Sequence, residues 1–166
     1  MATKADFTPE EWRQVLGSVM MAGMAVTLAD PSGLIGMTKE GIASGSALIA
    51  AKSDPNANAL VKAAVADFET SEGRSAAREC IKTTVSGKQA AEMKDALLAA
   101  LARVGDVLDA KASADASAFK AWLAQISQRV ADAAGEGGFL GFGGVRVSDA
   151  EKATLADIAK ALKQPV

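Results

Sequence analysis

The segment that decides the fold is residues 8–29, which read TPEEWRQVLGSVMMAGMAVTLA. Its opening is typical of a helix start: Thr8 and Glu11 have the spacing of a capping box. Pro9 fits the first helical position, where an N–H donor would have no partner. The apolar residues that follow surround the helix axis on nearly all sides. We therefore predict a helix over residues 9–29 that lies in the middle of a helical bundle.

Two Asp-Pro pairs carry the same start signal, because the Asp oxygen can accept from the free amides of a first helical turn. Asp30-Pro31 predicts a second helix that runs to about Lys52. Glycines inside this helix lower its stability, and either close contact with a neighbouring helix or a break near residues 41–45 would account for them. Asp54-Pro55 predicts the start of a third helix, with a turn expected at residues 70–75.

The second half of the chain continues this pattern. Ser86 with Gln89 and Ser148 with Glu151 have capping-box spacing, so we expect them to open the fifth and the last helix. A sixth helix is predicted over residues 114–134. Outside the first helix, the apolar residues that repeat at helical spacing form the predicted core. They are Leu60, Val61, Ala64, Val65, Phe68, Ala77, Cys80, Ile81, Thr84, Met93, Leu97, Leu101, Val104, Leu108, Phe119, Trp122, Leu123, Ile126, Val130, Leu155, Ile158, Ala159 and Leu162.

The composition favours the same architecture. Of the 166 residues 37 are alanine, aromatic residues make up 4% and tyrosine is absent. Alanine is the best helix former, and its small side chain lets helix backbones approach closely. We predict an all-α protein, with a single domain over residues 1–166 built as a bundle of about seven helices with one Gly-rich loop.

The missing residue types exclude several kinds of chemistry. The chain has no histidine and one cysteine, which excludes a catalytic triad, a Cys–His pair, a His-bearing zinc site and an internal disulfide. Its 18 basic and 20 acidic residues are spread along the chain, whereas nucleic-acid binding needs clustered cations. No acidic residues have the spacing of a calcium-binding loop. We expect no catalytic residues, no cofactor, no metal ion and no nucleic-acid partner.

No segment is suited to stable membrane insertion. The longest apolar stretch, residues 15–29, is too short for a bilayer core of about 30 Å. Residues 1–10 lack the apolar core of a secretory signal. We expect a cytoplasmic protein.

Residues 135–147 read GEGGFLGFGGVRV and form the predicted Gly-rich loop. The loop lacks the preceding strand and the terminal Lys-Ser/Thr that a phosphate-binding loop requires. It carries three large apolar side chains, Phe139, Leu140 and Phe142. If exposed, they would contact a protein partner or a membrane. If buried, they would close one end of the bundle, which is the arrangement we favour because most large apolar side chains are buried.

Three methionines form a second candidate site. Met20 and Met24 lie in the first predicted helix and Met37 in the second. Methionine is flexible and suits promiscuous apolar binding. These side chains either fill the core or line a cavity for a small apolar ligand, and we favour the core.

Cys80 is the one thiol of the chain, with Arg78 and Lys82 close in sequence. Neighbouring cations can lower the pKa of a thiol and make it reactive. A buried cysteine more often acts as a small, inert apolar residue, and we favour that interpretation.

The last part of the chain, from Phe119 to Leu162, resembles half of the TerB-like helical domain associated with tellurite resistance. The resemblance rests on the helix entry at residues 147–151, VSDAE, and on the stripe at residues 155–162, LADIAKAL. Earlier in the chain, residues 26–33, VTLADPSG, resemble the corresponding turn of a first half of this domain. That family has an acidic turn implicated in cation binding. Here the turn has no acidic residue, so the resemblance implies an all-helical interaction module without a metal site.

These observations favour a non-enzymatic helical module that acts by association with a protein partner or with itself, through Phe139, Leu140 and Phe142. The alternative is a helical bundle that binds a small apolar ligand or lipid.

Overall fold

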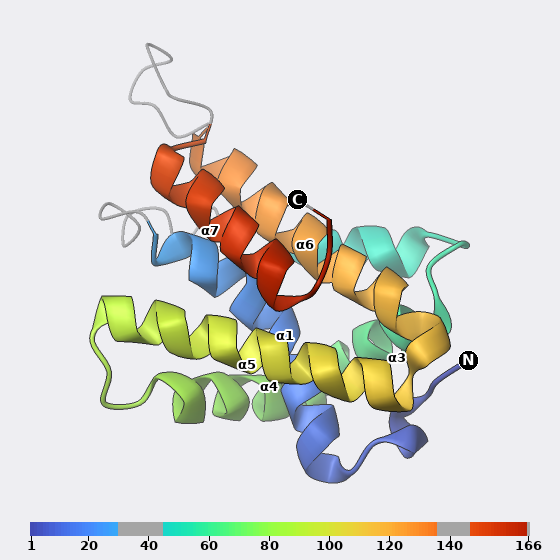
Figure 1. Cartoon of the computed structure of the whole chain (residues 1–166). Coiled ribbons are helices and arrows are strands. Elements are labelled where there is room, and N and C mark those ends of the chain that lie inside the picture. Colours follow the sequence, from blue (N-terminus) through green and yellow to red (C-terminus); the bar gives the residue numbers. More distant parts are fainter. Residues whose placement is uncertain (30–44, 136–146, 166) are drawn as a thin grey trace.

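The computed structural model describes residues 1–29, 45–135 and 147–165, and the regular elements of these residues are all helices (Figure 1). They are η1 (Lys4–Asp6), α1 (Pro9–Thr27), a helix over residues 45–53, α3 (Ala59–Phe68), α4 (Ser71–Val85), α5 (Ala90–Lys111), α6 (Ser113–Gly135) and α7 (Asp149–Ala161). The predicted all-α bundle of about seven helices is confirmed.

Helix α1 lies at the centre of the bundle, as predicted. It contacts α3, α4, α5, α6 and α7, which surround it in Figure 1. Its capping box is present: Glu11 N donates to Thr8 Oγ1 at 3.2 Å, and Thr8 N donates to the Glu11 carboxylate at 2.7 Å. The helix ends at Thr27, two residues before the predicted end.

Helices α1 and α4 pack closely at Gly17 and Cys80. A Cβ atom placed on Gly17 would lie 2.6 Å from Cys80 Sγ and 2.9 Å from Cys80 Cβ. These distances are shorter than real Cβ atoms show, so only glycine fits at this crossing without a shift. The small side chains of the sequence here serve helix contact, as the composition predicts.

The predicted start of the third helix at Asp54-Pro55 is wrong. Asp54 instead forms a turn, in which its Oδ1 accepts from Asn56 N at 2.8 Å. Helix α3 begins at Ala59 with Asn58 as its N-cap, and Asn58 Oδ1 accepts from Val61 N at 2.9 Å. Asn58 is favoured over Asp54 as the N-cap because its side-chain amide also donates to Asp115 O and Oδ1 on α6, each at 3.0 Å.

Two other predicted boundaries are wrong. Residues 70–75 are not a turn, because α4 already begins at Ser71, with Thr70 Oγ1 accepting from Gly73 N at 2.9 Å. Ser86 does not open the fifth helix. It ends α4, Gly87 follows with a φ of +72°, and α5 begins at Ala90 with Gln89 as its N-cap.

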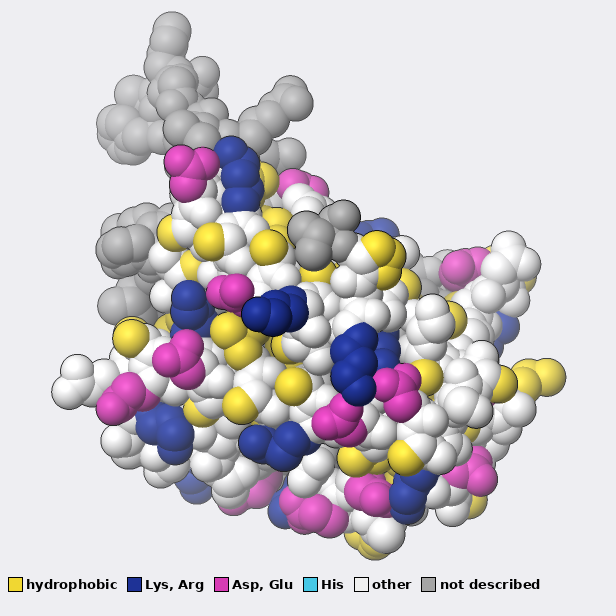
Figure 2. All heavy atoms as spheres, viewed as in Figure 1, with side chains coloured by type: hydrophobic (Ala, Val, Ile, Leu, Met, Phe, Trp, Pro, Cys, Tyr) yellow, Lys and Arg dark blue, Asp and Glu magenta, His cyan; other side chains and the backbone are white. Residues whose placement is uncertain are grey.

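The last two helices agree with prediction. Helix α6 spans Ser113–Gly135, and α7 begins with the predicted box, in which Ser148 N donates to the Glu151 carboxylate at 2.7 Å. The buried apolar side chains form one cluster, to which every described helix except η1 contributes. On the face shown in Figure 2, acidic and basic side chains are interspersed, with apolar atoms between them.

Candidate functional site

A cavity lies between the helix at residues 45–53, the turn that follows it, the start of α3 and the middle of α6. In Figure 1 this helix is turquoise and lies beside α6. The cavity has a volume of about 240 Å³, comparable to about eight liquid waters. Its lining residues are Ala47, Ala50, Ala51, Asp54, Asn56, Ala57, Asn58, Val61, Ala118, Trp122, Gln125 and Arg129.

Helix α6 supplies the polar wall of this cavity. Ala118, Trp122, Gln125 and Arg129 follow one another at intervals of four, three and four residues, which places them on one face of the helix. Three of these four side chains carry N–H donors: an indole, a primary amide and a guanidinium.

Trp122 is the side chain in this wall with an unmet bonding requirement. It is 7% exposed, and its ring packs edge-to-face on the fully buried Phe119, with ring centroids 5.4 Å apart. Its Nε1 is buried and has no acceptor among the described residues. A buried donor without an acceptor is unfavourable by about 1–3 kcal/mol, so an occupant that accepts from Nε1 would gain affinity.

Gln125 and Arg129 lie further along the same face, and both are exposed. Within the part of the chain that the structure describes, neither side chain has a hydrogen-bond or ion-pair partner. A helical side chain leans toward the N-terminus of its helix, so that of Arg129 covers the turn that holds Gln125. Both side chains are therefore available to donate to an occupant of the cavity that they line.

Apart from the side-chain amide of Asn56, which has no partner among the described residues, the opposite wall is hydrogen-bonded or apolar. The Asn58 amide is fully engaged with Asp115 and Val61, and Asp54 accepts from Asn56 N. Ala47 and Ala51 are buried and supply a small, apolar surface. The cavity thus combines an apolar side with a side rich in donors, which is typical of sites for small molecules.

The thiol of Cys80 does not make a second site. Burial raises the pKa of Cys80, and this effect exceeds the opposing influence of Arg13 and Arg103. A raised pKa leaves less of the reactive thiolate at neutral pH. This supports the inert interpretation, and the cations that act on the thiol come from α1 and α5 rather than from Arg78 and Lys82.

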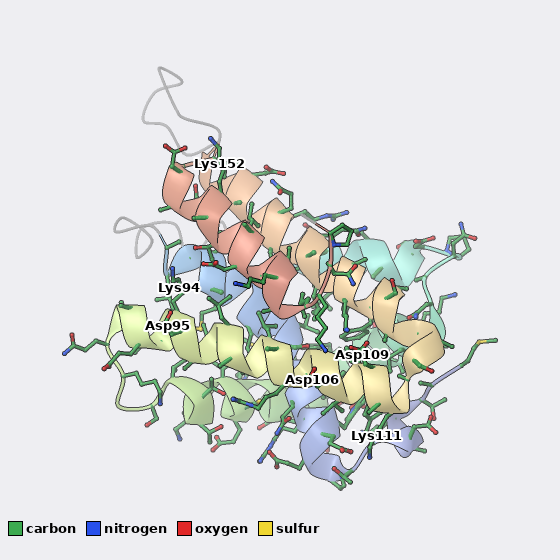
Figure 3. All side chains as sticks on the ribbon, viewed as in Figure 1. Lys94, Asp95, Asp106, Asp109, Lys111 and Lys152 are labelled. Carbon is green, nitrogen blue, oxygen red and sulfur yellow. The ribbon has the colours of Figure 1, made fainter. Side chains whose placement is uncertain are left out.

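A charged cluster joins α5, α6 and the residues that follow α7. The buried Lys120 donates to Asp109 Oδ1 at 2.6 Å, and Lys163 donates to Asp106 Oδ1 at 2.8 Å. Asp106 and Asp109, labelled in Figure 3, lie on the side of α5 that faces these partners. The bond from Lys120 holds the pKa of Asp109 below its ordinary value. All four charges are paired with one another, so the cluster serves helix docking.

The site residues predicted from the sequence differ in exposure, and several of them lie outside the described residues. Met20 is 37% exposed, and Met24 is half-buried against the core. Met37 lies outside the described residues. So do Phe139, Leu140 and Phe142, and protein association through them stays a prediction from the sequence.

Sequence reasoning missed the polar face of α6. It assigned Trp122 to the core stripe, which its burial bears out, but not to a cavity. One signal was available: Gln125 and Arg129 continue the face of Trp122 at helical spacing. The wall opposite could not be foreseen, because it depends on where residues 45–58 lie against α6.

The described residues contain no group of His, Cys, Asp and Glu suited to hold a metal ion. None of the helices in the described ranges is long and apolar enough to cross a bilayer. Comparisons of the chain with family models, with curated proteins and with solved structures found no match. The TerB-like resemblance of residues 119–162 therefore stays a prediction.

Proposed function

We propose that the protein is a non-enzymatic binder of a small molecule, which it holds in the cavity beside α6. The observation that carries this proposal is Trp122, which lines the cavity and whose buried Nε1 donor has no acceptor among the described residues. Buried polar groups are nearly always hydrogen-bonded in native proteins, so an unpaired one is a place to look for a bound molecule.

The size of the cavity supports a small ligand. Its volume of about 240 Å³ is below the roughly 300–1,000 Å³ of sites that hold drug-sized molecules. Binding without chemistry is supported by the described lining residues, among which Asp54 is the one carboxylate and none could act as its partner in acid–base catalysis. This proposal develops the alternative of a small-ligand binder and adds a polar anchor to it.

The test begins with a native mass spectrum of the freshly purified protein, in which a co-purifying small adduct is expected. Calorimetric titration with benzamide, benzoate, hexanamide and hexanoate follows. At least one of these probes should bind with a stoichiometry of one. Replacing Trp122 by Phe removes the donor and keeps an aromatic ring, so we expect affinity to fall by about tenfold.

Two further variants separate loss of binding from loss of fold. Trp12→Phe removes the other indole, which does not line the cavity, and should leave affinity within about twofold. Ala118→Leu fills the cavity from an exposed position and should abolish binding while helical circular dichroism is unchanged. Absence of an adduct together with absence of binding by all four probes would refute the proposal.

A further inference from the structure

We infer that the occupant of the α6 cavity is a small monocarboxylate with an apolar body. This inference rests on the proposed function and narrows it to one class of ligand.

The donors of the cavity match a carboxylate. An ionised carboxylate is an acceptor with two oxygens and about four lone-pair sites, and it offers no donor of its own. The α6 wall has the complementary pattern of donors. Trp122 and Arg129 have donors only, and Gln125 can present its amide N–H groups. A neutral amide or alcohol would bring its own N–H or O–H to a wall that has few acceptors.

Arg129 gives this wall its charge. Guanidinium binds carboxylate in a two-pronged geometry, and such charge-assisted bonds are about twice as strong as neutral ones. No carboxylate in the described ranges pairs with Arg129. The cation is therefore available to a ligand.

Asp54 limits the charge of the occupant. It is the other charged residue in the lining among the described residues, and its carboxylate lies in the turn that follows the helix at residues 45–53. A doubly charged anion such as phosphate would be attracted by one cation and repelled by this carboxylate. A single negative charge held at Arg129, with an apolar body against Ala47 and Ala51, fits both walls.

The test compares probes of equal shape and different charge. Calorimetric titration should show that benzoate binds at least about tenfold more tightly than benzamide, and hexanoate more tightly than hexanamide. Arg129→Gln removes the charge and keeps a polar side chain, so it should abolish this preference without weakening the amides. Arg78→Gln on α4, an exposed arginine that does not line the cavity, is the matched control and should change neither affinity.

Asp54→Asn gives an independent readout. Asparagine can keep the bond to Asn56 N and removes the negative charge, so carboxylate affinity should rise by about two- to threefold and the rise should shrink in high salt. If the amides bind as tightly as the acids, or phosphate binds more tightly than either acid, the carboxylate inference is refuted and the binding function stands. If none of the probes binds and no adduct is found, both are refuted.

Discussion

The two tryptophans of the chain differ in the hydrogen bonding of their indole N–H groups. Trp12 Nε1 donates to Asp67 Oδ2 at 2.6 Å, and its ring packs against Phe7 with centroids 5.6 Å apart. Trp122 is buried to a similar extent, yet its Nε1 has no acceptor in the described residues. Since both indoles are buried, the hydrogen bond is the main difference between them.

This contrast predicts unequal effects on stability. Trp12→Phe removes a bond to a charged group, and we expect it to lower the free energy of unfolding by about 2–4 kcal/mol, including lost packing. Trp122→Phe breaks no bond within the protein, so we expect a loss below about 1.5 kcal/mol. Urea unfolding of both variants measures the difference. An equal or larger loss for Trp122→Phe would mean that its Nε1 has a partner inside the fold.

The helix ends show where local sequence suffices. The boxes of Thr8 with Glu11 and of Ser148 with Glu151 were correctly predicted, because each is complete within four residues. The start of α3 was not, because Asp54 and Asn58 compete locally and the contact of Asn58 with Asp115 on another helix decides between them. For the same reason the cavity could not be predicted from the sequence, because it exists only once residues 45–58 pack beside α6.

The crossing of α1 with α4 gives a prediction about helices in contact. Gly17→Ala would raise helix propensity by about 1 kcal/mol, yet its Cβ would lie 2.6 Å from Cys80 Sγ. We expect the clash to prevail and the free energy of unfolding to fall by about 1–3 kcal/mol.

Gly105→Ala on α5 is the matched control for this prediction. Its added Cβ would be 3.5 Å from the nearest atom, Lys120 Cε, which is ordinary contact. This variant should be neutral or more stable by up to about 1 kcal/mol. Thermal unfolding of the two variants measures the difference, and a stabilised Gly17→Ala would show that α1 and α4 are not closely packed there.

Across the whole molecule, three carboxylates hold separate helices together. Glu11 on α1 accepts from Lys111 on α5 at 2.7 Å, and Asp67 on α3 accepts from Trp12 on α1. Asp109 on α5 accepts from Lys120 on α6. The bond from Lys111 lowers the pKa of Glu11. Burial raises the pKa of Asp67, but the bonds from Trp12 and Lys4 outweigh it and the net shift is downward.

These shifts predict that the bundle loses stability in acid. A carboxyl with a lowered pKa stabilises the fold above its ordinary value, 4.5 for Glu11 and 3.8 for Asp67 and Asp109. This contribution is lost as the pH falls through the lower value of the folded state. The midpoint of urea unfolding should therefore decrease as the pH falls below about 4.5.

Variants assign this pH dependence to its source. Asp109→Asn should lower the midpoint at pH 7 and make it less sensitive to acid, because the group no longer titrates. Asp157→Asn, at an exposed position of α7, should leave the profile unchanged. If the profile of Asp109→Asn overlays that of the unaltered protein, its pairing with Lys120 does not contribute.

The contrast between the tryptophans also makes the protein its own sensor. The chain has no tyrosine, so its near-ultraviolet emission comes from these two indoles alone. The emission of Trp12 is held constant by its fixed bond to Asp67, while that of Trp122 responds to whatever fills the space beside it. A shift in the emission wavelength of the purified protein would therefore report occupancy of the α6 cavity without a dye, before the occupant has been identified.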